Sequence, residues 1–302
     1  MTTVIEVRDL VKTFGRTRAL DGLDLSVDDG EVHGFLGPNG AGKSTTIRVL
    51  LGMLRRRSGT ATVLGLDPWR DAVTVHRDVA YVPGDVSLWP NLSGGETIDF
   101  LTRLRGGADP ALRSRLLRDF DLDPKKKGRS YSKGNRQKVA LVAAFARPAK
   151  LYVFDEPTSG LDPVMESVFR SEVERVQRAG ATVLLSSHIL SEVEQLCDRV
   201  TIVRAGRAVE TGALAQLRHL TRTSFRVGTG ATLADIEMLP GVHDARVEAD
   251  HLAFDVDTDA MNAVLSALTR AGVGSLTVSP PSLEELFLRH YGDRPEPEPA
   301  TR

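Results

Sequence analysis

The segment Gly37–Thr45 reads GPNGAGKST, and it gives the strongest indication of the fold. It matches the phosphate-binding pattern G-x-x-x-x-G-K-[ST] at Gly37, Gly42, Lys43 and Ser44. Glycines are needed because backbone N–H groups must turn inward on a triphosphate without a Cβ in the way. The preceding EVHGFLG has the β-rich composition of a strand, and the following TTIRVLLGML carries apolar residues at helical spacing. The sequence therefore predicts a strand, a nucleotide-binding loop and a helix; the alternative is an accidental glycine-rich turn.

The parts of this loop have different expected roles. Lys43 supplies a positive charge for the β- and γ-phosphates, and Ser44 offers a hydroxyl to Mg²⁺. The helix that opens at about Gly42 adds the positive end of its dipole. The expected nucleotide-binding residues in the loop are Gly37, Pro38, Asn39, Gly40, Ala41, Gly42, Lys43, Ser44 and Thr45.

Composition sets limits on the class of protein. The 302 residues include 39 Lys and Arg against 40 Asp and Glu, so we expect no general affinity for nucleic acid. The single cysteine, Cys197, excludes an internal disulfide and makes the cytosol the default compartment; its apolar surroundings favour a buried side chain over a nucleophile. No apolar run approaches the roughly 20 residues that span a bilayer, and no signal-peptide pattern is visible. A membrane role would therefore depend on a partner.

Strands alternate with helices as far as about residue 212, which predicts a parallel sheet with right-handed crossovers. LYVFD at 151–155 is a continuous apolar run, typical of a fully buried strand. Residues 163–178 have helical spacing, and ATVLLSSH then predicts a strand. Two or three short strands are expected before the phosphate loop, a strand pair within 55–65, and mainly helix over 92–122.

The composition changes near Gly212, and a second domain is expected over residues 221–291. SFRVG, TLADIEML, VHDARVEA, HLAFDVD, DAMNAVLSALTRAG and SLTVS predict the order β-α-β-β-α-β of a ferredoxin-like unit. Ser282 and Glu285 form the pattern of a capping box that opens a last helix. Residues 292–302, rich in proline and charge, are expected to be a disordered tail.

Two acidic residues follow the buried strand. Asp155 ends LYVFD about 110 residues after Lys43, as expected for the second acidic motif of a P-loop NTPase. The carboxyl end of a parallel strand lies beside the phosphate loop, so Asp155 is expected to hold Mg²⁺. Glu156 is expected to polarise the water that attacks the γ-phosphate. The alternative for these residues is a helix-capping acid.

GPNGAGKST, YSKGNRQ, LYVFDEPTSGLD and SSH together resemble ATP-binding-cassette (ABC) ATPases in order and approximate spacing, over about residues 4–210. The resemblance implies a P-loop NTPase cassette at 1–215 with a parallel sheet core, an antiparallel β subdomain and a helical signature subdomain at about 86–150. The implied fold class of the cassette is α/β, and a small C-terminal α+β ferredoxin-like domain follows it. It also implies ATP and Mg²⁺ as cofactors, and two cassettes that meet head to tail so that each ATP lies between two chains.

The family's signature motif, LSGGQ in its common form, corresponds here to YSKGN. Tyr131, Lys133 and Asn135 are departures, whereas Ser132 and Gly134 match the residues that the family places against the γ-phosphate. Ser132, Gly134 and Asn135 are therefore expected to bind ATP of the facing subunit.

LSGGE at 92–96 is closer to the common form of the signature, but its spacing is wrong. The family places its signature one helix, about 20 residues and 30 Å, before the acidic strand, and only YSKGN stands there. We expect LSGGE to begin a helix, with Ser93 as N-cap and Glu96 three residues later.

Further site residues follow from the same resemblance. His188 resembles the switch histidine that bridges Glu156, the γ-phosphate and the facing subunit, although a lone histidine is more often structural. Asp162 lies in SGLD, which resembles the D-loop that crosses to the partner. Phe14 resembles the aromatic residue on which adenine stacks; the alternative is a core aromatic. Gly84 stands where the family has Gln or Glu, and either Asp85 substitutes for it or the loop is only a hinge.

The resemblance implies the ATP-hydrolysing subunit of a two-component ABC transporter, most similar to the drug- and antibiotic-export (ABC-2) branch. The implied partners are a second copy or a related cassette, and a separate multi-helix membrane permease; the implied location is the cytoplasmic face of the membrane. One alternative is a non-transport ABC ATPase of translation or resistance, which usually carries two cassettes. A chromosome-type protein would need a coiled-coil insertion that the sequence lacks. A further alternative is an ATPase switch whose C-terminal domain senses a ligand.

Overall fold

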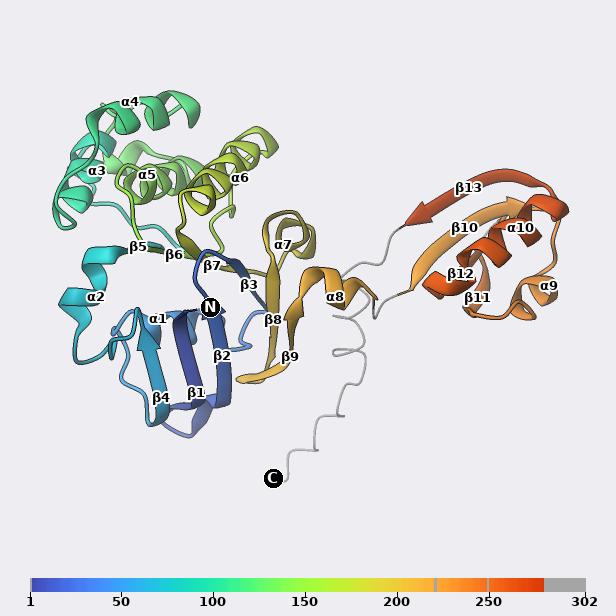
Figure 1. Cartoon of the computed structure of the whole chain (residues 1–302). Helices are drawn as coiled ribbons and strands as arrows, with labels where there is room; N and C mark the ends of the chain where they lie inside the picture. Colours follow the sequence, from blue (N-terminus) through green and yellow to red (C-terminus); the bar gives the residue numbers. More distant parts are fainter. Residues whose placement is uncertain (1, 220–221, 249, 280–302) are drawn as a thin grey trace, which may run out of the picture. The chain divides into compact units, whose positions relative to one another are not determined.

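The computed structural model describes residues 2–219, 222–248 and 250–279 and divides the chain into two units, Met1–Gly212 and Ala213–Arg302 (Figure 1). The capping box at Ser282 and Glu285 and the tail at 292–302 lie outside these residues. Within the described part of the chain, no helix combines the length and apolarity needed to cross a bilayer.

A six-stranded sheet forms the centre of the first unit, in the order β5-β6-β7-β3-β8-β9 among the described residues. Its strands are β3 (Val32–Leu36), β5 (Val79–Val82), β6 (Leu151–Asp155), β7 (Thr182–Ser187), β8 (Arg199–Arg204) and β9 (Arg207–Ala213). The pairs from β5 through β6, β7 and β3 to β8 are parallel, which confirms the predicted parallel sheet. Because β3 lies between β7 and β8, the loop that follows it leaves from the middle of the sheet.

Helices connect the strands of this sheet. In chain order, α1 (Lys43–Leu50) follows β3, α2 (Ala72–Asp78) precedes β5, α6 (Pro163–Arg178) follows β6 and α7 (Leu190–Leu196) follows β7. The next helix, α8 (Leu214–His219), follows β9 in the chain and belongs to the second unit. The helix at 163–178 begins and ends where the sequence predicts. Cys197, the C-cap residue of α7, is buried, and burial raises the pKa of its thiol well above the ordinary value, as expected for a structural cysteine.

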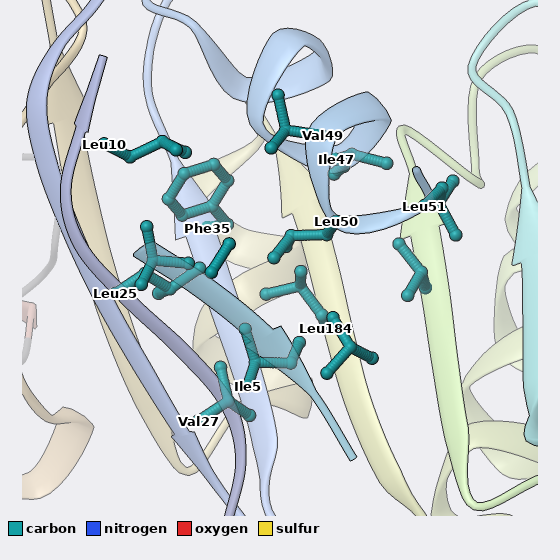
Figure 2. Packing of buried hydrophobic residues seen from close by; sticks show 14 of the residues in the cluster. Ile5, Leu10, Leu25, Val27, Phe35, Ile47, Val49, Leu50, Leu51 and Leu184 are labelled. Carbon is teal, nitrogen blue, oxygen red and sulfur yellow. The ribbon is translucent and has the colours of Figure 1, made fainter. Parts of the chain in front are cut away.

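A three-stranded antiparallel sheet, ordered β2-β1-β4, packs against α1 and the large sheet. Its strands are β1 (Thr3–Phe14), β2 (Thr17–Asp28) and β4 (Ser58–Val63). Figure 2 shows Ile5, Leu25 and Val27 of this sheet facing Phe35 of β3, with Ile47 and Leu50 of α1 close by. This apolar cluster holds the helix that carries Lys43 against both sheets.

The expected strand pair within 55–65 is wrong. The described residues of that segment form β4 alone, and the chain then reverses with Leu64 and Gly65 at φ 53° and 78°. The backbone of Leu66 pairs directly with Val63, which leaves no length for a second strand.

The helical part of the first unit contains α3 (Gly94–Arg103), α4 (Pro110–Asp119), the 3₁₀ turn η1 (Gly128–Ser130) and α5 (Lys133–Phe145). Two glycines with positive φ, Gly106 and Gly107, separate α3 from α4. An ion pair ties this part to the core, because Arg115 of α4 donates to both carboxylate oxygens of Glu172 on α6, at 2.7 and 3.0 Å.

The second unit contains a four-stranded antiparallel sheet ordered β11-β12-β10-β13 among the described residues. Its elements are β10 (Thr223–Thr229), α9 (Leu233–Glu237), β11 (Val242–Glu248), β12 (His251–Val256), the turn η2 (Thr258–Ala260), α10 (Met261–Ala271) and β13 (Val273–Ser279). Phe225 and Phe254 stack in its core at 5.5 Å between ring centroids. The order β-α-β-β-α-β with the two helix-linked strands flanking β12 confirms the predicted ferredoxin-like unit.

Candidate active site

The phosphate loop joins β3 to α1 and depends on two glycines for different reasons. Gly42, at φ 111°, caps α1 in a conformation that L side chains rarely adopt. A Cβ at Gly37 would lie 2.5 Å from the carbonyl oxygen of Val203, so the close approach of backbones there excludes any side chain. No side chain of the described residues caps α1. The N-terminus of α1 is thus open to an anion, as the sequence motif predicts.

Lys43 is held inside this loop. Its side chain is 5% exposed, and its ammonium group donates to the carbonyl oxygens of Gly37 at 2.5 Å and Pro38 at 3.2 Å. Burial lowers the pKa of Lys43, while the nearby carboxylates of Glu156 and Asp155 oppose that shift. A buried ammonium group bonded only to neutral carbonyls is stabilised when a polyanion binds beside it. The loop therefore fits a triphosphate.

Asp155 lies at the end of β6, directly opposite Ser186 of β7. The hydroxyl of Ser186 donates to Asp155 Oδ1 at 2.5 Å, and the Asp155 side chain is buried. A carboxylate in a fixed orientation, beside a serine hydroxyl from the phosphate loop, provides the hard oxygen ligands that Mg²⁺ prefers. The residues present therefore fit the magnesium ion that the sequence predicts.

Glu156 and His188 come from neighbouring loops and contact each other. Glu156 Oε1 lies 3.2 Å from Nδ1 of His188 and 3.9 Å from the ammonium of Lys43. The Glu156 backbone is left-handed, at φ 50°, and its N–H donates to the carbonyl of Ser186 at 3.0 Å. This conformation directs the carboxylate to the phosphate loop and brings together the two residues predicted to be catalytic.

A cavity of about 370 Å³ lies beside Asp155 and Glu156. It is lined by Asn39, Ser44, Arg48, Tyr81, Pro83, Gly84, Asp85, Asp155 and Glu156. Ser44 and Asp155, the two predicted metal ligands, and Glu156, the predicted base, thus face one space. Arg48 and Tyr81 were missed by sequence reasoning, and burial together with the charge of Asp155 raises the pKa of Tyr81 to about 12.

Gly84, which stands where the family has Gln or Glu, packs against the backbone of Asp155. A Cβ at Gly84 would lie 3.1 Å from the carbonyl oxygen of Asp155, tighter than most real Cβ contacts. The backbone of Gly84 therefore runs close against the end of β6. Asp85 lines the same cavity, where the sequence proposed it as a substitute for the missing side chain.

The expected signature residues lie at the start of α5. Ser132 is the N-cap, and its hydroxyl accepts from the N–H of Asn135 at 3.3 Å. Gly134 packs against the D-loop so closely that a Cβ there would lie 2.3 Å from the carbonyl oxygen of Gly160. None of these residues is part of the described lining of the cavity at Ser44.

LSGGE is a helix start, as predicted. Ser93 is the N-cap of α3, accepts from the N–H of Glu96 at 3.1 Å, and donates its own N–H to the Glu96 carboxylate at 2.6 Å. Both reciprocal hydrogen bonds of the capping box are therefore formed.

Asp162 and Phe14 lie in other parts of the first unit. Asp162 caps α6 and accepts from the N–H groups of Val164 and Met165, at 3.1 and 3.0 Å. Phe14 ends β1 and is 47% exposed, with the ammonium of Lys12 5.0 Å from its ring centroid, so it is not a core aromatic. Contacts of both residues with ATP remain predictions.

Two protein families match this sequence. Residues 20–159 match the family described as "ABC transporter", and residues 212–291 match "ATP-binding protein DrrA1-3-like, C-terminal domain". The second match falls on the ferredoxin-like unit.

Known proteins are similar over nearly the whole chain. The daunorubicin/doxorubicin resistance ATP-binding protein DrrA of Streptomyces peucetius is 35% identical over 308 residues, which span 96% of this chain and 93% of that protein. Nod factor export ATP-binding protein I of Rhizobium etli is 32% identical over 297 residues, spanning 96% and 94%. A solved ATP binding subunit of an ABC transporter has a TM-score of 0.67 at 33% identity, covering 72% of this chain and 92% of that one. The chain therefore belongs to the ATP-binding proteins of the ABC transporter family, with a C-terminal domain of the DrrA type.

Proposed function

We propose that this protein hydrolyses ATP and uses the energy to drive export through a separate membrane permease. The observation that carries the proposal is the cavity that unites Ser44, Asp155 and Glu156 beside Lys43. Each of these residues supplies one chemical role that phosphoryl transfer to water requires.

The roles follow from the positions. Lys43 and the N-terminus of α1 neutralise the β- and γ-phosphates. Ser44 and Asp155 hold Mg²⁺, which when bound neutralises charge on the phosphate oxygens. Glu156 takes the proton of the attacking water, and His188, 3.2 Å from its carboxylate, holds that carboxylate in place.

We propose that a second copy completes the site. Ser132, Gly134 and Asn135 are absent from the described lining of the cavity at Ser44, which supports a contact with the ATP of another chain rather than with their own. We propose a head-to-tail dimer of two copies, or of one copy and a related cassette. In it, Phe14 stacks on adenine, and the D-loop that ends at Asp162 faces the partner.

An apolar groove of about 670 Å³ between α2, β5 and the helical part is the proposed docking site for the permease. Val73, Trp89 and Leu104 line it and are 77%, 48% and 68% exposed, and apolar side chains gathered in one exposed groove are typical of an interaction site. Tyr81 and Pro83 line both this groove and the cavity at Ser44. A partner in the groove therefore touches the segment that also borders the nucleotide.

The relatives indicate what such a partner carries. One relative is named for daunorubicin and doxorubicin resistance and the other for Nod factor export, so we propose an organic export cargo for this chain. The protein then acts at the cytoplasmic face of the membrane.

The test has two parts. The purified chain should hydrolyse ATP when Mg²⁺ is present and lose activity when EDTA is added or when Lys43 is replaced by alanine. In the native host, a Leu104→Asp variant should move from the membrane fraction to the supernatant. Met238→Asp, at a site 84% exposed in the second unit, is the matched control and should stay with the membranes. Hydrolysis that survives Lys43→Ala would refute the assigned site.

A further inference from the structure

Lys133 occupies the position in the signature where the common form of the motif has glycine. It is the first residue of α5, and its ammonium donates to the hydroxyl of Ser159 at 2.8 Å. The Cγ and Cδ atoms of Lys133 lie over Gly160, 3.6 Å from where a Cβ of that residue would be. The side chain therefore bridges two loops, the signature and the D-loop, that both face the partner in the proposed dimer.

Other contacts already hold the two loops together. The amide of Gln137 donates to the carbonyl oxygen of Pro157 at 2.9 Å, and both groups are buried. The backbones of Gly134 and Gly160 are in close contact. These neutral contacts also join the segment after β6 to α5, so the exposed bond from Lys133 to Ser159 is one of several between them.

Lys133 is exposed, and its positive charge has no ion-pair partner among the described residues. Its acceptor is a neutral hydroxyl, and among the described residues no carboxylate lies within ion-pair distance of its ammonium. The first turn of α5 contains no acidic residue, so the cation also opposes the dipole of its own helix. An anion that arrives at this point would give Lys133 a charged acceptor in place of a neutral one and would interact favourably with the N-terminus of α5.

We propose that Lys133 senses the γ-phosphate across the dimer: its ammonium leaves the Ser159 hydroxyl of its own chain and binds the terminal phosphate of the ATP held by the facing copy. The inference rests on the proposed dimer and deepens it, because it assigns a charge-based distinction between ATP and ADP. Ser159 serves as the resting acceptor in the separated subunit. Closure of the dimer exchanges a neutral acceptor for a charged one, which makes the closed state depend on the γ-phosphate.

The test measures dimer formation in the full chain carrying Glu156→Gln, so that bound ATP persists. Sedimentation gives the ATP concentration at half-maximal dimer. Adding Lys133→Met, which keeps the aliphatic contact with Gly160, should raise that concentration about 10-fold or more, and Lys133→Arg should restore most of the effect. Affinity of the monomer for ADP, measured by calorimetry, should stay unchanged because the signature acts on the other chain's nucleotide; it also reports that the variant is folded.

Ser159→Ala separates a sensor from a structural tie. If Lys133 rests on Ser159 and acts on the phosphate, removing the hydroxyl frees the ammonium, and less ATP should suffice for dimerisation. If the bond only stabilises the D-loop, Ser159→Ala and Lys133→Met should both raise the ATP concentration at half-maximal dimer. That result overturns the proposal. An unchanged requirement in Lys133→Met overturns it as well and leaves the dimer intact. Absence of any ATP-dependent dimer in the Glu156→Gln protein would refute the dimer itself and, with it, this role of Lys133.

Discussion

The hydroxyl of Ser186 donates to the carboxylate of Asp155 across neighbouring strands, at 2.5 Å. The pairing of β6 with β7 puts the two residues directly opposite each other at the carboxyl end of the sheet. The backbone carbonyl of Ser186 also accepts a hydrogen bond from the N–H of Glu156. One residue therefore orients both the proposed metal ligand and the proposed base.

Ser186→Ala should weaken the binding of Mg²⁺ more than the binding of nucleotide. Loss of an outer hydrogen bond to a metal ligand typically costs about 10- to 100-fold in affinity or activity. We expect half-maximal ATP hydrolysis to need about 10-fold more Mg²⁺. Ser187→Ala is the control, since the Ser187 hydroxyl bonds Glu192 at 2.6 Å and not Asp155. Equal effects of the two variants would contradict the role assigned to Ser186.

Glu156→Gln should abolish hydrolysis and trap a dimer with ATP bound. The amide keeps the shape of the side chain and cannot accept the proton of the attacking water, so the rate should fall by about 10² to 10⁴. Single-turnover hydrolysis and sedimentation with ATP measure the two effects. If turnover persists near the original rate, Glu156 is not the base.

Ser132→Ala and Ser93→Ala form a matched pair. Both serines are N-caps that accept a backbone N–H, and losing such a cap costs about 1 kcal/mol. The two variants should therefore lose similar stability in thermal unfolding. Only Ser132→Ala should cripple ATP hydrolysis, because only its loop is expected to contact ATP. The reverse result would make LSGGE the signature.

Glu172→Gln should remove a pH-dependent part of the stability. Burial tends to raise the pKa of Glu172, but hydrogen bonds from Arg115 and Arg175 outweigh it, and the pKa is lowered overall. A lowered pKa in the folded state adds stability above the ordinary glutamate pKa, and this stability is lost as pH falls through the folded value. The variant should be about 2 kcal/mol less stable at pH 7.

This difference should shrink at acidic pH, when Glu172 of the unaltered protein is itself protonated. Urea unfolding at several pH values between neutral and about pH 3 measures it. Glu174→Gln provides the control, because the Glu174–Arg178 pair on the same helix is exposed and contributes little. A constant difference at all pH values would show that the charge of Glu172 is not responsible.

Local spacing was sufficient to predict much of the site. The glycines and Lys43 lie in one continuous segment, and Asp155 ends an apolar run that is typical of a buried strand, so their chemistry could be proposed without the fold. The same holds for Ser93, whose capping partner Glu96 is three residues away. The ferredoxin-like order was also predictable, because each of its strands and helices has its own periodicity.

Other parts depend on which strands and helices become neighbours. Nothing near Ser186 in the sequence indicates that it bonds Asp155, since this requires β6 and β7 to be adjacent and in register. The contact between Arg115 and Glu172 joins residues 57 positions apart and was missed for the same reason. The second strand expected within 55–65 fails because the two-residue turn after β4 is followed by a single bridge, Val63 to Leu66, and not by a strand.

The left-handed backbone of Glu156 shows that folding and function make opposite demands on this residue. A residue with a Cβ at φ 50° costs about 1–2 kcal/mol relative to glycine, which adopts that conformation freely. A chain selected only for stability would have glycine at this position. The protein instead keeps a strained glutamate at the turn after β6. The folded state is less stable for it, but the strained residue places a carboxylate beside Lys43.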